Sequence, residues 1–343
     1  MSDLKINNIS NKGGDGGPVI AGVSTVSSST FIGMPNSNTA FRGAGGGRGV
    51  ILNISTPSVS KNNEFITIAT RGNSQDFGDQ NVARASKAGF ASLTRGFDGG
   101  GSTPTLQTDI EFVTISSQGG GQDFGDLTLA RSYPAGASNS TRGIMAGGSV
   151  NPTPATQTAN IEFVTMSTSG VVSNFGELTL ERTYMSGAGC QSTTRGIFAG
   201  GHPMNTNLID FVLFSAGGTA TDFGDLTLAR SGISAGSNAT RGIFAGGSDG
   251  AQSPSAGVNT IDYITMATEG NAIDFGDAIK ATFRWMGAGM YSETRGVHCG
   301  GYPATNLIQY ITVATTGNAL DFGDLTQSVS NSGNSSDTHG GLG

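Results

Sequence analysis

Short apolar strands alternate with glycine-rich turns along almost the whole chain. Apolar and polar residues follow a largely period-two pattern in 110–115, 161–166 and 261–266, which is typical of half-buried β-strands. Glycine clusters bound these runs, as expected where strands end in turns. No segment of useful length has the periodicity of an amphipathic helix. The pattern therefore predicts an all-β protein.

A Phe-Gly step followed by an acid recurs with the strands. Its phenylalanines are separated by 47, 51, 48, 52 and 47 residues, and they are Phe77, Phe124, Phe175, Phe223, Phe275 and Phe322. An Arg-Gly pair opens a short apolar strand in each repeat, with the arginines Arg48, Arg95, Arg142, Arg195, Arg241 and Arg295. A period near 50 residues is typical of propeller blades, and each repeat divides into four short strands, as a blade requires.

The two ends of the chain contain an eroded further copy of the repeat. Phe31 precedes Phe77 by 46 residues, and His339 follows Phe322 by 17, where an arginine would be expected. With a mean period of about 49 residues, the 343 residues correspond to seven units. We therefore expect a seven-bladed β-propeller of four-stranded antiparallel blades over 18–343. Its last blade would combine N- and C-terminal strands, and an N-terminal arm over 1–17 would precede it.

Charged residues also recur with the repeat. A second set of equivalent arginines consists of Arg84, Arg131, Arg182, Arg230 and Arg284. Acids at the Phe-Gly steps have the same period, so we expect arginine–carboxylate pairs that tie strands or blades together. The buried phenylalanine of each step is expected to fill the space between neighbouring sheets, at about 1.5–3 kcal/mol each. A basic ring that binds anions is the less favoured alternative, because the acids recur in step.

Composition narrows the class of protein. The net charge is −7 and the few lysines are not clustered, which argues against nucleic-acid binding. The N-terminus has no apolar core of the length that a secretory signal needs, and no run approaches a membrane span. The two cysteines, Cys190 and Cys299, are too few for a disulfide framework and fit reduced core residues of a protein folded in a cytoplasm.

Two resemblances follow from the repeat. The unit resembles the kelch-type repeat, which has a small-residue strand, an apolar strand ending in Gly-Gly and an aromatic strand. It differs where kelch has a tryptophan and this chain has Phe-Gly-Asp-Leu. The amino-acid sequences of 240–247, 262–268 and 274–277 resemble repeats in virion structural proteins of marine tailed bacteriophages.

The phage resemblance implies a non-enzymatic virion protein, assembled in the host cytoplasm, that serves adhesion or receptor binding in the tail, or surface decoration. Its partners would be other virion proteins, onto which the arm would dock the propeller, copies of itself, and a host surface glycan or protein. The alternatives are a capsid decoration or head-fibre protein, and a lectin-like glycan-binding module outside a virion.

Catalytic and metal motifs are weak. Asp-Phe-Gly occurs without the other kinase motifs, and three histidines are few for the metal site of a kelch-like copper radical oxidase. His298 and Cys299 are adjacent on a strand and point to opposite faces, so they do not easily share zinc. Calcium at the Asp-rich turns is less favoured than turn capping. We therefore expect no catalytic residue, no cofactor and no metal. Asp98 and His298, polar where other repeats are apolar, suggest a water-filled channel or, second, a local site.

The repeats vary most in the loops after the paired glycines. These loops differ in length, contain prolines that stiffen them, and share one face of the ring. Variable loops on a rigid scaffold are how binding surfaces are commonly built, although unselected drift explains the variation nearly as well. The candidate binding residues are Asn151, Pro152, His202, Pro203, Asp249, Gln252 and Tyr302, together with Trp285, whose indole would stack on a sugar or pack between blades.

Overall fold

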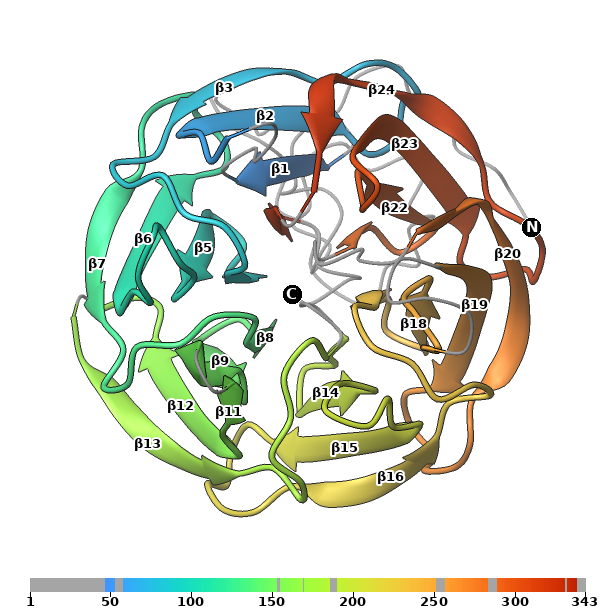
Figure 1. Cartoon of the computed structure of the whole chain (residues 1–343). Coiled ribbons are helices and arrows are strands. Elements are labelled where there is room, and N and C mark those ends of the chain that lie inside the picture. The colour runs from blue at the N-terminus through green and yellow to red at the C-terminus, as the bar shows by residue number, and fades with distance from the viewer. Residues whose placement is uncertain are drawn as a thin grey trace, which may run out of the picture. The chain divides into compact units, whose positions relative to one another are not determined.

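A computed structural model describes residues 47–52, 58–152, 155–168, 170–185, 190–250, 257–282, 289–330 and 332–337. Within these ranges the regular elements are all β-strands, and they form six antiparallel sheets arranged as the blades of a propeller (Figure 1). The third strand of each sheet is buried along most of its length, since β6 and β15 each have four consecutive buried residues, so both faces of these strands are covered. The prediction of an all-β propeller is therefore confirmed.

The strands of each blade follow one another from the centre of the ring outward. Blade 1 contains β25 (Gly333–Ser336), β1 (Arg48–Leu52), β2 (Asn62–Thr67) and β3 (Gln75–Asp79). Blade 2 contains β4 (Ala88–Ala91), β5 (Arg95–Gly99), β6 (Asp109–Thr114) and β7 (Gln122–Asp126). Blade 3 contains β8 (Ala135–Ser138), β9 (Arg142–Ala146), β12 (Asn160–Thr165) and β13 (Val172–Glu177).

The other three blades repeat this order. In blade 4 the described strands are β14 (Arg195–Ala199), β15 (Leu208–Leu213) and β16 (Thr221–Asp225), which correspond to the second, third and fourth strands of the other blades. Blade 5 contains β17 (Ser234–Ser237), β18 (Arg241–Ala245), β19 (Val258–Thr265) and β20 (Ile273–Thr282). Blade 6 contains β21 (Met290–Tyr291), β22 (Arg295–Cys299), β23 (Thr305–Thr312) and β24 (Leu320–Val329). A hairpin of β10 (Ser149–Pro152) and β11 (Ala155–Gln157) projects from blade 3.

The prediction of seven blades is wrong, because the described strands form a ring of six blades. Dividing the full length by the period treated the N-terminal segment as part of the repeat, whereas the six Arg-Gly strands and six Phe-Gly strands already account for every blade. Phe31, His339 and the arm over 1–17 lie outside the described residues.

The two ends of the described ring pair with each other, through β1 rather than through the segment before it that was expected to close a seventh blade. β25 lies beside β1, with Gly49 opposite Ser336. The Asp337 carboxylate accepts a hydrogen bond from the Arg48 amide at 2.8 Å. In blade 3 the Asn139 side chain accepts from the Arg142 amide at the same distance. The closing contact therefore reproduces, between distant parts of the chain, a turn that is continuous in the other blades.

The phenylalanines of the Phe-Gly steps lie in bulges of the outer strands and are buried between sheets. Phe223 of blade 4, for example, belongs to one apolar cluster with Ile233 and Phe244 of blade 5. Its carbonyl accepts a hydrogen bond from the Gly270 amide of blade 5 at 2.8 Å. Gly224 follows with φ +145°, a conformation that only glycine adopts readily. The Phe-Gly step is therefore the contact between one blade and the next.

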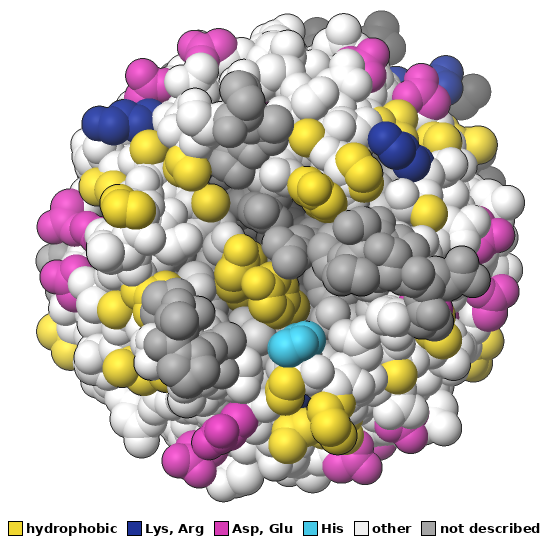
Figure 2. All heavy atoms as spheres, viewed as in Figure 1, with side chains coloured by type: hydrophobic (Ala, Val, Ile, Leu, Met, Phe, Trp, Pro, Cys, Tyr) yellow, Lys and Arg dark blue, Asp and Glu magenta, His cyan; other side chains and the backbone are white. Residues whose placement is uncertain are grey.

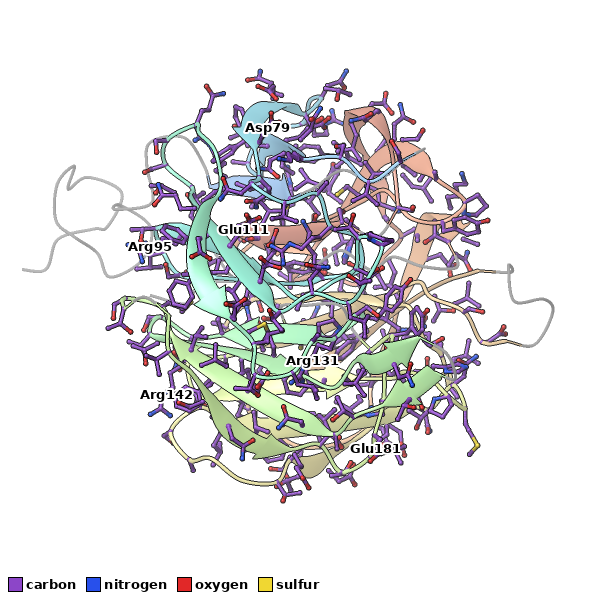
Figure 3. The ribbon with its side chains drawn as sticks, turned by 60° about the vertical axis from the view of Figure 1, so that its left-hand side comes forward. Asp79, Arg95, Glu111, Arg131, Arg142 and Glu181 are labelled. Carbon is purple, nitrogen blue, oxygen red and sulfur yellow. The ribbon has the colours of Figure 1, made fainter. Side chains whose placement is uncertain are left out.

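The arginines of the second strands also join neighbouring blades. Each guanidinium lies 4.4–5.2 Å from the ring centre of an aromatic residue on its own third strand. Arg95 donates to the Met166 carbonyl of blade 3 at 3.1 Å, and Arg295 donates to the Ile68 carbonyl of blade 1 at 2.9 Å, which closes the ring. Figure 3 shows Arg95 and Arg142 along the same edge of the propeller. These residues bind backbone carbonyls rather than the predicted Phe-Gly acids, and Arg195 pairs with Glu269.

The four described arginines of the other set are fully buried and pair with a different set of acids. Arg131 contacts Glu162 at 2.6 Å, and Arg230 contacts Asp262 at 3.0 Å. Arg84 and Arg182 pair in the same way, and every one of these carboxylates stands on a second or third strand. The prediction of paired arginines is right, but the acids of the Phe-Gly steps are not their partners.

The described residue at the equivalent position before blade 6 is not an arginine. At the equivalent position before blade 6 the structure has Thr282, whose carbonyl accepts from the Gly247 amide just as the Arg230 carbonyl accepts from Gly201. The matching acid is replaced by Gln309. Arg284, assigned to this set from the sequence, lies outside the described residues.

Candidate functional site

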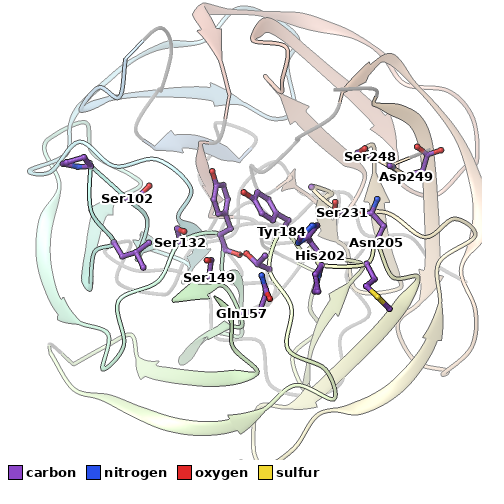
Figure 4. Close-up of a pocket in the computed structure, with 18 residues that line it drawn as sticks. Ser102, Ser132, Ser149, Gln157, Tyr184, His202, Asn205, Ser231, Ser248 and Asp249 are labelled. Atoms are coloured by element: carbon purple, nitrogen blue, oxygen red, sulfur yellow. Dashed lines mark hydrogen bonds between the residues drawn. The ribbon is translucent and has the colours of Figure 1, made fainter. Parts of the chain in front are cut away.

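The loops after the paired glycines surround a pocket on one face of the ring. We call this surface the loop face, formed by 100–108, 147–152, 155–158, 200–206 and 246–250. The pocket has a volume of about 830 Å³ and is lined by segments of blades 2 to 5 (Figure 4). The arginines of the second strands lie at the other ends of those strands, so the loop face is free of the contacts that join the blades there.

Short backbone bridges hold the walls of the pocket. Ser132 and Ser149 exchange two backbone hydrogen bonds of 2.9 and 2.7 Å. Ser231 and Ser248 do the same in blade 5, at 3.0 and 2.8 Å. Each bridge ties the residue after a buried arginine to the residue after a glycine pair. The hydroxyl side chains at the pocket wall are thereby attached to the rigid part of the blade.

Four successive blades place a left-handed residue directly after this bridge. Its φ is +64° at Ser86, +56° at Tyr133, +55° at Tyr184 and +69° at Gly232. The Tyr133 amide donates to the Ser86 carbonyl at 2.6 Å, and the Gly232 amide donates to the Tyr184 carbonyl at 2.7 Å. Glycine adopts this conformation without strain, whereas a bulky side chain there costs on the order of 1–3 kcal/mol.

The two strained tyrosines form an aromatic pair in the pocket. The rings of Tyr133 and Tyr184 are stacked, with centroids 4.0 Å apart and planes 28° apart. The His202 ring lies edge-on to Tyr184, at a centroid distance of 6.1 Å. Both tyrosines are half-buried, and Met204 beside them is 88% exposed. Figure 2 shows hydrophobic side chains gathered beside a histidine near the middle of this face.

The pocket is polar but carries little charge. Its described lining includes six hydroxyl side chains of serine and threonine, namely Ser102, Ser132, Ser149, Thr183, Ser231 and Ser248. Gln157 and Asn205 add amide groups, and Asp249 is the one carboxylate among these lining residues. No lysine or arginine occurs among them. The pocket therefore combines an aromatic surface with neutral donors and acceptors.

The structure brings together some of the residues predicted from the sequence. His202, Pro203 and Asp249 line the pocket. Asn151 and Pro152 lie in the β10–β11 hairpin, between the lining residues Ser149 and Gln157 in sequence, and are not among the described lining residues. Tyr302 is 45% exposed on the blade 6 loop and does not line the pocket. Gln252 and Trp285 lie outside the described residues.

Sequence reasoning missed the tyrosine pair. The available signal was the second residue after each buried arginine, which is serine, tyrosine, tyrosine and glycine in blades 2 to 5. A position that accepts glycine in one copy and tyrosine in two others indicates an unusual backbone with an added side chain. The left-handed conformation itself is not visible in the sequence.

The preferred interpretation of Asp98 and His298 as channel-facing residues is wrong. Their exposed fractions are 0% and 2%. His298 is hydrogen-bonded to the Ser234 hydroxyl at 2.8 Å and to the Tyr291 hydroxyl at 2.7 Å. Asp98 pairs with Arg84 and Lys87. Both residues therefore belong to local buried networks.

The innermost strands explain this burial. A Cβ atom placed on Gly136 of blade 3 would lie 2.4 Å from the Gly89 carbonyl oxygen of blade 2. A Cβ atom on Gly89 would lie 2.3 Å from the Asn334 carbonyl oxygen of blade 1. The inner strands of these three blades therefore approach one another closely along their backbones, which agrees with the burial of the second strands behind them.

Replacing His298 with phenylalanine, the residue at this position in blades 4 and 5, is expected to flatten the acid side of the stability profile. Burial lowers the pKa of His298 from 6.5 to about 3. Between these two pH values the unfolded chain binds a proton that the folded chain does not. The free energy of unfolding therefore falls by about 1.4 kcal/mol for each unit by which the pH is lowered below 6.5. Urea unfolding from about pH 8 to 4 measures this slope.

The variant also leaves two buried hydroxyls without their imidazole partner, which should cost about 1–3 kcal/mol at neutral pH. His298→Phe should therefore be less stable than the parent at neutral pH but lose less stability on acidification. Equal slopes for the two proteins would contradict the assignment of His298 as a buried neutral imidazole.

The described residues bear on metal binding, on the two thiols and on membrane insertion. Among them, no group of three or more His, Cys, Asp or Glu side chains is placed to hold a metal ion. Cys190 and Cys299 are buried free thiols, and burial raises the pKa of Cys299 to about 12. Within the same ranges, no helix is both long and apolar enough to cross a membrane.

No protein-family model matches the sequence, and no curated protein matches it significantly.

Proposed function

We propose that this chain is a non-enzymatic recognition propeller of a tailed-phage particle, and that the loop face with its pocket is the recognition surface. The observation that carries this proposal is the pocket of about 830 Å³ whose aromatic pair is held in a strained conformation. Strained residues that the surrounding structure maintains occur preferentially at functional sites.

The scaffold suits recognition because its charged groups are used to hold it together. Arg84, Arg131, Arg182 and Arg230 are fully buried and paired with acids. Three groups whose pKa values burial shifts strongly are buried in the blades and do not line the pocket, namely Lys87, Tyr291 and His298. In the pocket, neutral hydroxyls and amides dominate, a composition that fixes the orientation of a bound molecule.

The proposed placement in a virion rests on the amino-acid sequence of the repeats. The sequences at 240–247, 262–268 and 274–277 resemble repeats of virion structural proteins of marine tailed bacteriophages. A rigid ring of interlocked blades that presents loops on one face also fits a component exposed on a particle. Adhesion to the host through the loop face is the activity that we propose.

Mass spectrometry of gradient-purified phage particles tests the placement. We expect the chain to be present in intact particles, and we expect added purified protein to compete with those particles for adsorption to host cells. Absence of the chain from the particles would overturn the virion assignment. Presence without competition would overturn adhesion and leave decoration of the particle.

A further inference from the structure

The tyrosine pair occupies a position where the fold itself needs only a left-handed residue. Gly232 occupies this position in blade 5. Ser86 occupies it in blade 2 and does not line the pocket. Glycine would satisfy the backbone at 133 and 184 with less strain. The two large rings at these positions are therefore not explained by the architecture of the blades, and both of them line the pocket.

The groups around the rings indicate the chemistry of the ligand. Hydroxyls of Ser132, Ser149 and Ser231 and the amide of Gln157 line the same pocket. These groups donate and accept hydrogen bonds without carrying charge. The described part of the lining contains no arginine or lysine, so a phosphate, a sulfate or a sugar carboxylate would meet no cation among these residues. Asp249, the one carboxylate among the described lining residues, disfavours such anions further.

We propose that the pocket binds an uncharged glycan, with a pyranose ring lying against the Tyr133–Tyr184 pair and its hydroxyls bonded to the serine and amide side chains. This inference rests on the proposed recognition function and specifies its ligand. Aromatic rings present an apolar face to the C–H groups of a sugar, and the neutral polar groups match its hydroxyls. The volume of about 830 Å³ is large enough for an oligosaccharide and lies within the range of ligand pockets.

A glycan microarray probed with the full-length protein tests this ligand class. The array carries neutral oligosaccharides, sialylated oligosaccharides and sulfated oligosaccharides, and we expect binding confined to neutral structures. The best-bound oligosaccharide is then titrated by calorimetry. An array without hits, or hits that are all acidic, would overturn the inference.

Glycine variants separate binding from folding. Tyr133→Gly and Tyr184→Gly remove the rings and relieve the left-handed strain, so each should weaken binding by about tenfold or more. Their unfolding temperatures should stay within about 4 °C of the parent. Ser86→Gly is the matched control, because it makes the same backbone change outside the pocket and should leave affinity unchanged.

Two further comparisons keep the test decisive. If Tyr184→Gly fails to fold, Tyr184→Asn replaces it, because asparagine tolerates the left-handed conformation. Unchanged affinity in a folded variant would overturn the role of the tyrosine pair. A protein found in particles that competes for adsorption but binds no neutral glycan would refute the ligand class while the proposed recognition function stands.

Discussion

Replacing Asp262 with alanine is expected to lower the free energy of unfolding by about 3–5 kcal/mol. The Asp262 carboxylate accepts from the Thr227 hydroxyl at 2.6 Å and from the Arg230 guanidinium at 3.0 Å, and the Asp262 and Arg230 side chains are fully buried. Burial lowers the pKa of Arg230, and Asp262 opposes that effect. Without the carboxylate, a buried guanidinium loses its counter-charge. Chemical denaturation followed by circular dichroism measures the loss.

Blade 6 supplies the matched rescue for this variant. There, Thr282 stands at the arginine position and Gln309 at the acid position, so the fold accepts a neutral version of the pair. The double variant Arg230→Thr with Asp262→Gln should therefore be more stable than Asp262→Ala. Glu269→Ala, which breaks the exposed pair with Arg195, should cost no more than about 1 kcal/mol. Equal losses for Asp262→Ala and Glu269→Ala would contradict the assigned burial.

The second large effect is expected at the contact between blades. Alanine at Gly224 would place its Cβ atom 2.5 Å from the backbone of Gly270 in the next blade, at a φ of +145°. The conformational strain alone amounts to on the order of 1–3 kcal/mol, and the clash adds to it because neither backbone can move independently. We expect the variant to unfold at a clearly lower denaturant concentration than the parent.

Gly270 is the internal control for this variant. Its φ is +151°, but a Cβ atom there would meet nothing within 4 Å. Gly270→Ala therefore carries the conformational strain without the clash, and we expect it to be more stable than Gly224→Ala by at least about 1 kcal/mol. Equal stability of the two variants would show that the Phe-Gly step does not depend on close approach of the next blade.

The repeat allowed the fold class to be predicted from the sequence, but it led to a wrong number of blades. Alternation in segments such as 110–115 predicts third strands that the structure contains as β6 and its equivalents. The count failed because a period says nothing about where the first repeat begins, and Phe31 was taken as a further copy. The six blades start at Arg48, and β25 completes the first of them.

The arginine pairs show a second limit of periodicity. Acids recur both at the Phe-Gly steps and on the third strands, and period alone cannot decide which of them faces the buried arginine. In the structure Asp79 of the first Phe-Gly step is exposed at the outer strand, whereas Glu111 on β6 is buried beside Arg84 (Figure 3). Burial decides which acid pairs with the arginine, because a buried guanidinium needs a buried counter-charge.

The candidate site was predictable in place but not in detail. Loop variation after the paired glycines located the face and named His202, Pro203 and Asp249, which line the pocket. Tyr133 and Tyr184 were missed because they precede the inner strands and not the variable loops. Their meeting depends on left-handed backbone in two blades and on the packing of one blade against the next. Neither property leaves a pattern that a single sequence reveals.

Hydrogen–deuterium exchange of the full-length protein, alone and with purified surface polysaccharide of the host bacterium, tests the central claim that the loop face is the recognition surface. Our account predicts slower exchange on addition of the polysaccharide in 131–134, 183–185 and 202–205, which line or adjoin the pocket. The turns at 92–95 and 139–142, at the opposite ends of the second strands, should be unchanged. Protection confined to those turns, or no protection at any site, would contradict it.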